Sequence, residues 1–329
     1  MIYKTFLASN TAKGFVGYFS DFMASHRTII LKGGPGTGKS TLMKKLARTA
    51  EKTGEDVWLF YCSSDPDSLD GVFFPSRNFV VLDGTSPHAL DATVPAINES
   101  IVNLLSAVDG NALLPHEDEI RALIKQKKQR FAAAYAALKA SAELDKHTSS
   151  LILDSADAAE LAAVIDSVYA DVSTAECSGE KRFFYDAFTP DGLIVGTYGF
   201  DKGFEKTAVK AGNRFLSVYA VNAVAERLKA VKKPFTAFYS AEWPDLVCQL
   251  IVGEKLITGV KDFGSFDKVY ALSDKPVFDK NAVTLQNAAI KSLNEAREWH
   301  KQIEKYYVQA IDFGIVSDLT DKIKQTIGL

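Results

Sequence analysis

Runs of apolar residues in the first third of the chain predict buried strands separated by a helix. Residues 28–32 and 56–62 carry apolar side chains at consecutive positions, which is typical of strands covered on both faces. Residues 39–52 repeat apolar side chains at helical spacing, and Gly54 marks the helix stop. With a further buried strand at 78–83, this order predicts an α/β fold with a doubly wound, mainly parallel sheet.

The segments around these elements are predicted from the same pattern. Residues 4–8 are expected to form a short strand, and residues 11–25 an amphipathic helix with its aromatic side chains on one side. The polar stretch 63–71 is expected to be a loop, because it combines Ser, Asp, Pro and Gly after a buried strand.

The segment from about 96 to 172 is rich in Ala, Lys and Leu, with apolar side chains at near-helical spacing. It predicts at least two long helices, arranged as a helical hairpin. The small, polar residues 173–181 mark a domain boundary. We therefore expect a first domain at 1–175, ending in this helical segment, and a second domain at 180–329.

The second half repeats landmarks of the first at a constant offset. Phe6 corresponds to Phe184 (184 − 6 = 178), and Gly34 corresponds to Gly212 at the same offset. We interpret the repeat as an internal duplication, which makes the second domain a related α/β half. Further pairs at this offset are Thr11 and Thr189, Gly14 and Gly192, Phe60 and Phe238, and Pro66 and Pro244.

A glycine-rich stretch between strand 28–32 and helix 39–52 carries the strongest chemical signal. The sequence GGPGTGKS matches the phosphate-loop pattern GxxxxGK[ST] at every position. Glycines let the backbone turn so that its N–H groups point at a phosphate, and the positive end of the following helix attracts the same anion. The candidate nucleotide-binding residues are Gly33, Gly34, Pro35, Gly36, Thr37, Gly38, Lys39, Ser40 and Thr41.

Three side chains are expected to act on the phosphates and on a metal ion. Lys39 is placed to reach the β- and γ-phosphates, and the Ser40 hydroxyl to bind Mg²⁺. Asp83 closes strand 78–83, where a carboxylate can hold the same ion. Because Gly84 follows, the strand end lacks an adjacent glutamate to activate water, which argues against a fast motor or helicase. The absence of an NKxD motif favours ATP over GTP.

Asp65 and Asp70 are the candidate catalytic carboxylates, together with Lys39. Both lie in the stretch 63–71, after a buried strand, where α/β sheets gather their ligands. The alternative is a Pro-containing turn with solvated carboxylates. Asp67 has a counterpart at Asp245, which favours a structural role for it and leaves the other two as candidates.

Two weaker signals lie further along the chain. His88 follows the Asp83 strand and could sense the γ-phosphate, although a structural role is the more common one for a lone histidine beside a proline. The basic run 125–130 could close on phosphates, with Arg121 and Arg130 nearby, or bind nucleic acid. A solvated helix face is the simpler interpretation.

The second half lacks the groups that hold phosphate and metal. At the 178-residue offset, Gly38, Lys39 and Ser40 are replaced by Leu216, Ser217 and Val218. We therefore expect it not to bind a triphosphate in the same way, and to serve as a structural partner, a substrate surface or a regulatory half.

The motif GGPGTGKST identifies residues of about 28–90 as similar to the P-loop NTPase superfamily. The wider sequence NTAKGF, LKGGPGTGKSTLMKKLA, YCSSDPDSLDG and VVLDGTSPH, followed by a second TPDG, resembles an uncharacterised bacterial ATPase-like family with two tandem P-loop halves. Both halves of that family commonly carry a phosphate loop, whereas this chain has AGNRFLSV at the second position. The resemblance implies a P-loop NTPase fold and no particular substrate.

The composition argues mainly against certain partners and locations. A formal charge of −3 and a pI near 6.0 give no whole-chain signal for nucleic acid or for an acidic membrane surface. The sequence has no apolar run of membrane-spanning length, and its 3 cysteines are widely spaced, as in reduced cytosolic proteins. We expect a cytoplasmic protein.

Together these features predict an ATP- and Mg²⁺-binding protein that acts as an ATPase or an ATP-dependent switch. The alternative is a kinase that transfers the γ-phosphoryl group to a small molecule bound near Asp65 and Asp70. ATP-dependent nucleic-acid binding is the weakest hypothesis, because it depends on the run 125–130 alone. The expected partners are the nucleotide and either a small-molecule acceptor or a protein.

Overall fold

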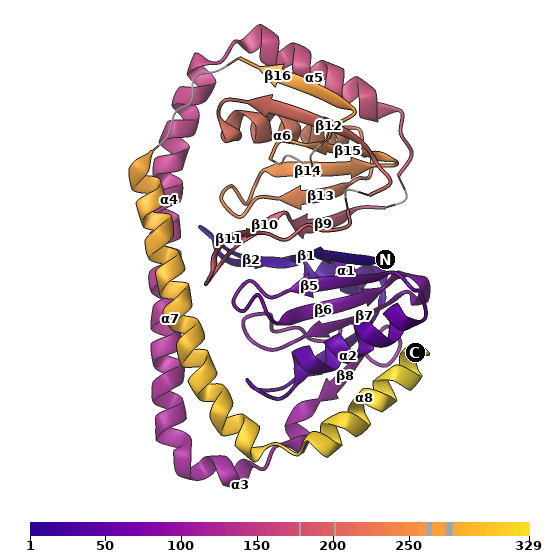
Figure 1. The fold of residues 1–329 in the computed structure, drawn as a ribbon, viewed down its shortest axis with the longest axis vertical. Helices are drawn as coiled ribbons and strands as arrows, with labels where there is room; N and C mark the ends of the chain where they lie inside the picture. Colours follow the sequence, from indigo (N-terminus) through magenta and orange to yellow (C-terminus); the bar gives the residue numbers. More distant parts are fainter. Residues whose placement is uncertain (178, 201, 261–264, 274–278) are drawn as a thin grey trace.

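The computed structural model describes residues 1–177, 179–200, 202–260, 265–273 and 279–329. Two α/β halves lie one above the other, and two long helices run along one side of both (Figure 1). Residue 178 of the expected boundary and short parts of the expected second domain lie outside the described residues.

The first half is built on a six-stranded sheet in the order β1-β5-β6-β7-β4-β8. β6 runs antiparallel to both its neighbours, whereas the other neighbouring pairs are parallel, so the sheet is mixed. The expectation of a loop over 63–71 is wrong at its end, because β6 begins at Leu69 and all its residues are buried. The strands are β1 (Ile2–Thr5), β4 (Arg27–Lys32), β5 (Val57–Tyr61), β6 (Leu69–Phe74), β7 (Phe79–Asp83) and β8 (Glu99–Asn103).

The second half contains a sheet with the same arrangement, β9-β13-β14-β15-β12-β16. Its β14 begins 178 residues after β6 (247 − 69), which is the offset found in the sequence. The shared strand order supports the interpretation as an internal duplication. The strands are β9 (Lys181–Phe184), β12 (Glu205–Ala211), β13 (Thr236–Tyr239), β14 (Val247–Val252), β15 (Lys255–Thr258) and β16 (Lys268–Leu272).

A third sheet, in the order β11-β10-β2-β3, joins the two halves. At its centre Asn10 pairs with Phe188, and Phe6 forms a bridge with Phe184 nearby. In both pairs a residue meets its own counterpart (188 − 10 and 184 − 6), as expected near a local twofold axis between duplicated halves. The strands are β2 (Ala8–Thr11), β3 (Gly14–Gly17), β10 (Asp186–Thr189) and β11 (Gly192–Val195).

The N-terminal segment differs from the prediction. The expected strand 4–8 is divided between β1 and β2, and the expected helix 11–25 contains β3 before the short helix α1 (Phe19–Ser25). Gly14 adopts a φ of +90°, and the Thr11 hydroxyl donates a hydrogen bond to its carbonyl. This tight turn takes the place of the first helical turns.

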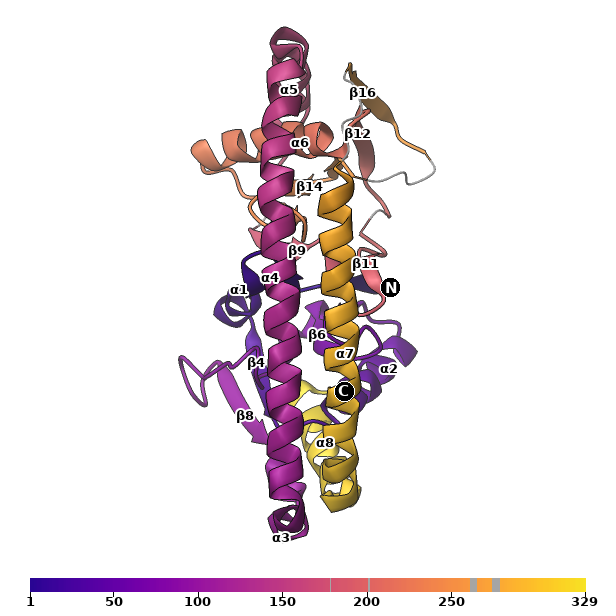
Figure 2. The same ribbon diagram turned by 90° about the vertical axis from the view of Figure 1, so that its left-hand side faces the viewer.

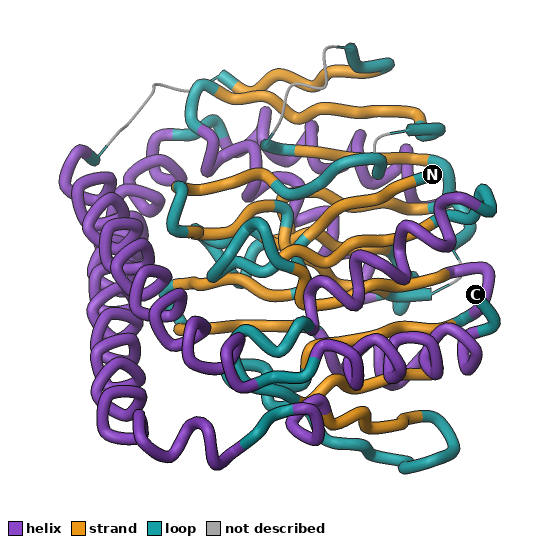
Figure 3. Tube along the Cα trace, turned by 60° about the horizontal axis from the view of Figure 1, so that its bottom comes forward, coloured by secondary structure: helices purple, strands orange, loops and turns teal. Residues whose placement is uncertain are grey.

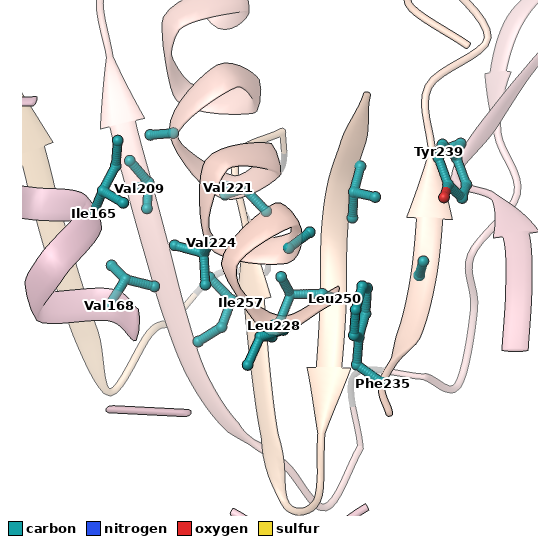
Figure 4. Close-up of a cluster of buried hydrophobic side chains, with 14 of the residues drawn as sticks. Ile165, Val168, Val209, Val221, Val224, Leu228, Phe235, Tyr239, Leu250 and Ile257 are labelled. Atoms are coloured by element: carbon teal, nitrogen blue, oxygen red, sulfur yellow. The ribbon is translucent and has the colours of Figure 1, made fainter. Parts of the chain in front are cut away.

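Each half combines a helix of its own with a helix that follows the other half in the sequence. α2 covers the first sheet and α6 the second, where its side chains pack on β12 and β14 (Figure 4). α8 follows the second half in sequence but packs on α2, whereas α5 follows the first half but packs on α6. These helices are α2 (Lys39–Lys52), α5 (Ala158–Ser173), α6 (Arg214–Ala230) and α8 (Phe313–Ile327).

The two long helices α4 (Glu117–Ser155) and α7 (Lys280–Ala310) pack along each other, as Figure 2 shows. The strands of the sheets run toward this pair (Figure 3). The expected helical hairpin over 96–172 is therefore wrong: the segment begins with β8, and α4 packs along α7. Only near its end does α4 share a buried cluster with α5, through Ile152. The physical reason is the buried cluster that α4 and α7 share, with Ala134, Leu138, Ala289, Leu293 and Phe188.

Three short pieces connect β8 to α4, namely the single-turn helix α3 (Gly110–Leu113) and a 3-10 turn on each side of it. At the other end of α4, Asp157 accepts hydrogen bonds from the first N–H groups of α5 and starts that helix in a new direction. None of the described helices is both long enough and apolar enough to cross a membrane.

Candidate nucleotide-binding site

The glycine-rich stretch forms the turn between β4 and α2. Gly36 and Gly38 have φ angles of +69° and +84°, a left-handed conformation that side chains other than glycine rarely adopt. The Thr37 hydroxyl closes the turn by donating a hydrogen bond of 2.8 Å to the Gly34 carbonyl. The pattern of glycines in the sequence thus corresponds to a real requirement of the backbone.

Lys39 lies back across this turn. Its ammonium donates hydrogen bonds to the carbonyls of Gly33 and Gly34, at 3.0 and 2.8 Å. Its Nζ is also 3.7 Å from Oδ2 of Asp83, and the two side chains are only 11% and 13% exposed. A cation and an anion that are both removed from water require such partners.

Asp83 reaches this position because β4 and β7 are adjacent and parallel, with Leu31 opposite Asp83. The Thr85 backbone N–H donates a hydrogen bond of 2.8 Å to Oδ1 of Asp83, and the Thr85 hydroxyl donates to the same oxygen. Burial raises the pKa of Asp83, whereas the charges of Lys39 and His88 lower it in part.

The expected metal ligands are compatible with a magnesium ion. Ser40 lies in the first turn of α2, where its Oγ accepts a hydrogen bond of 3.0 Å from the Leu69 N–H and keeps a second lone pair. Among the described residues, no three His, Cys, Asp or Glu side chains form a metal cluster. Magnesium does not require one, since it is commonly held by one or two protein oxygens, phosphates and water.

The two candidate carboxylates lie in different surroundings. Asp65 is in the loop after β5, where it accepts a hydrogen bond of 2.5 Å from the Ser68 hydroxyl. Its charge raises the pKa of both His300 and Glu304, so it lies near α7. Asp70 is a residue of β6 and is 2% exposed. Asp65 and Asp70 thus have different partners, and a shared acceptor site at the two carboxylates stays a prediction.

Asp70 forms an ion pair with His88. The distance from Nε2 of His88 to Oδ1 of Asp70 is 3.2 Å, and the rings of Phe15 and Phe19 each pack 5.0 Å from the imidazole. Burial alone would lower the pKa of His88, but Asp70 and Asp83 outweigh burial and raise it. Oδ2 of Asp70 and Nδ1 of His88 are buried without a hydrogen-bond partner.

The C-terminal end of α7 covers the glycine-rich turn. A Cβ added to Gly34 would lie 2.8 Å from the Tyr307 ring, and one added to Gly36 would lie 2.9 Å from Val308 and 3.0 Å from the Glu304 carbonyl. The Gly36 backbone also lowers the pKa of the Glu304 carboxyl, although burial and Asp65 raise it overall. Glycine is therefore needed here for close packing as well as for its φ angle.

Lys127 of α4 contacts the same part of α7. Nζ of Lys127 lies 3.1 Å from Nδ1 of His300, whose Nε2 lies 3.6 Å from the Glu304 carboxylate. Burial lowers the pKa of His300 to about 4, and the nearby charges of Lys127 and Lys39 act in the same direction. Of the features noted in the sequence, only the basic run 125–130 includes one of these three residues, Lys127. Arg121 and Arg130 instead form exposed ion pairs with Glu117 and Glu295.

The corresponding turn of the second half is built differently. α6 begins at Arg214, the counterpart of Gly36 (36 + 178), so the helix continues through positions that form the loop in the first half. The Arg214 guanidinium lies 2.7 Å from Asp186 and also pairs with Glu242. At the counterpart of Gly36, the second half thus has the first residue of a helix and a cation held by two carboxylates.

Comparison with known proteins finds one partial similarity. A family model described as Nephrocystin 3, N-terminal, matches residues 18–72. The matched residues include the phosphate loop, α2 and the strands β4 and β5. No curated protein and no solved structure matches the chain.

Proposed function

We propose that the first half binds a nucleoside triphosphate with Mg²⁺, preferably ATP, and that the chain is an ATPase or an ATP-dependent switch. One observation carries the proposal: the buried ion pair of Lys39 and Asp83 lies beside the left-handed turn at Gly36 and Gly38. These groups come from adjacent parallel strands and the helix between them, which is the placement that phosphate-loop chemistry requires.

Each residue then has a defined task. The N–H groups of the loop surround the phosphates, and Lys39 exchanges its two carbonyl partners for phosphate oxygens. Ser40 and Asp83 are placed to hold Mg²⁺, which when bound neutralises charge on the phosphoryl group. His88 has a raised pKa and is more readily charged than an ordinary histidine, so it suits an electrostatic role better than that of a base.

The covering helices suggest how nucleotide binding is transmitted. α4 belongs to the chain before the second half, and α7 follows the second half. α7 lies against the loop of the first half, and α4 is joined to α7 there by the contact between Lys127 and His300. A nucleotide that changes these contacts would shift the pair relative to both sheets. Limited proteolysis across residues 110–175, with and without ATP, measures that shift.

Binding itself is tested by Lys39→Ala. We expect the variant to lose ATP affinity by at least about tenfold, because a charge-assisted contact with the phosphates is removed. Lys45→Ala is the matched control, since Lys45 is exposed on the same helix. Isothermal titration calorimetry of both variants decides the point, and equal affinities in the two variants would refute the proposal.

The kinase alternative has less support, since Asp70 is held by His88 and Asp65 lies near α7. It differs from the ATPase in a measurable way. Phosphate release from ATP without any acceptor supports hydrolysis, whereas ATP consumption that depends on an added small molecule supports transfer.

A further inference from the structure

We propose that Lys127 of α4 is a phosphate-binding residue of the site in the first half, and that Glu304 of α7 holds the place of the phosphate until a nucleotide enters. The inference rests on the proposed nucleotide binding and extends it to two residues of the helical pair. Displacement of Glu304 by the phosphates would then be the step by which the nucleotide acts on that pair.

Lys127 differs from the other basic residues of the run 125–130. Lys125, Lys128 and Arg130 are exposed, whereas Lys127 is half-buried and its ammonium contacts His300 of α7. Because the pKa of His300 is lowered to about 4, this histidine is neutral at pH 7 and offers a lone pair instead of a charge.

The charge of Lys127 is thus incompletely compensated. The ion pairs within the described residues do not include Lys127. Burial lowers its pKa, Glu304 attracts it from a distance, and Lys39 and Lys128 repel it. Lys127 is therefore a half-buried cation close enough to Lys39 for the two charges to repel each other, and its direct partner, His300, is neutral. Such an environment favours a strong anion.

Glu304 is the acidic residue that lies against the glycine-rich loop in this structure. Its backbone lies against Gly36, because a Cβ added to that glycine would lie 3.0 Å from the Glu304 carbonyl. The Gly36 backbone also lowers the pKa of the Glu304 carboxyl, as a nearby N–H group does. In a phosphate loop these N–H groups are the ones that hold phosphate oxygens. Burial and the negative charge of Asp65 raise the pKa of Glu304, so its negative charge is held less favourably than in water.

A nucleotide would therefore exchange one anion for another. The phosphate chain carries more negative charge than one carboxylate, and it would lie between Lys39 and Lys127. Displacement of Glu304 would remove a contact between α7 and Gly36, while Lys127 would add a contact from α4 to the phosphates. The helical pair would thus respond to the presence of the phosphates directly.

The first test compares Lys127→Met with Lys128→Met, which removes a neighbouring exposed lysine from the same helix. We expect Lys127→Met to weaken binding of both ATP and inorganic tripolyphosphate by at least about tenfold, and Lys128→Met to leave both affinities nearly unchanged. Thermal unfolding of the nucleotide-free variants is measured alongside. Lys127→Met should unfold at or above the wild-type temperature, because it removes a charge that burial disfavours.

Equal affinities for the two methionine variants would overturn the role of Lys127. A folded wild-type protein that binds neither ligand would overturn the proposed function itself, which is a distinguishable result. A loss of affinity in Lys127→Met accompanied by a lower unfolding temperature would point to a structural role and would also count against the inference.

The second test compares Glu304→Gln with Glu298→Gln. Glu298 is exposed on α7 and pairs with Lys301, so its loss should leave binding unchanged. Glu304→Gln should tighten tripolyphosphate binding severalfold, because the competing carboxylate is removed. Weaker or unchanged binding in Glu304→Gln would overturn the exchange, whatever the result for Lys127.

Discussion

His88 and Asp70 form a buried ion pair beside the phosphate loop, with 3.2 Å between Nε2 and Oδ1. They are brought together by the antiparallel strand β6, which places Asp70 next to the segment that follows β7. The pair lies close enough to Asp83 for both carboxylates to raise the pKa of His88. The free energy of unfolding should therefore depend on pH through this His88–Asp70 pair.

The first prediction concerns Asp70→Asn. The pKa of His88 is raised above 6.5 in the folded state, so the folded protein holds this proton more tightly than the unfolded chain does. The stability from the pair is full below the unfolded value and is lost as the pH rises through the folded value. We expect Asp70→Asn to cost about 3 kcal/mol near pH 6 and clearly less near pH 9. Urea unfolding at both pH values measures this, with the exposed Asp67→Asn as control.

The second prediction concerns Asp83→Asn. The variant removes a carboxylate placed to hold Mg²⁺, so the increase in ATP affinity that Mg²⁺ provides should fall by about tenfold or more. Binding in the presence of a chelator should change much less. Asp91→Asn is the control, because Asp91 is 89% exposed and pairs with Lys32. Titrations with and without Mg²⁺ that show the same loss would contradict the assignment of Asp83 to the metal.

The third prediction compares two glycines with positive φ angles. Gly54→Ala should cost about 1 kcal/mol for the backbone conformation alone, since a Cβ there meets nothing within 4 Å. Gly36→Ala should cost about 1–3 kcal/mol more, because its Cβ would lie 2.9 Å from Val308. Denaturant unfolding measures both costs. Equal costs would show that α7 does not pack on the loop as closely as the distances indicate.

The fourth prediction concerns the second half. Arg214→Ala leaves the carboxylate of Asp186, which is 1% exposed, without its cation, so we expect a loss of about 3–5 kcal/mol. Arg227→Ala on the same helix breaks an exposed pair with Asp166 and should cost less than about 1 kcal/mol.

Neither arginine variant should change ATP affinity, because both lie in the half without the loop. Denaturation and titration of the same samples test stability and binding separately. A marked loss of ATP affinity in folded Arg214→Ala would assign the second half a direct part in nucleotide binding.

Local sequence patterns were sufficient where short-range interactions decide the structure. The expected helix 39–52 has the bounds of α2, and the apolar runs 28–32 and 78–83 coincide closely with β4 and β7. The strand β6 was missed because its first residues, Leu69 and Asp70, continue a polar stretch. Its burial comes from neighbours on both sides in the sheet, and no local pattern records that.

The candidate site residues show the same difference between local and long-range interactions. Lys39, Ser40 and Asp83 could be named from the sequence because the loop and the strand end are contiguous segments with fixed geometry. Lys127 could be named only as part of the basic run 125–130, and Glu304 not at all. The two residues are 177 positions apart (304 − 127) and lie near each other only because α4 packs on α7.

By itself the sequence determined the glycine-rich turn, the lysine that follows it and the 178-residue repeat, because each depends on local backbone conformation or on residue identity. Only the tertiary structure decided which surfaces meet the loop. Helices with small buried residues can pair with several partners, and here the shared cluster of Ala134, Leu138, Ala289 and Leu293 selected α4 and α7. As a result, the C-terminal end of α7, which follows the second half in the sequence, packs on the glycine-rich turn of the first half.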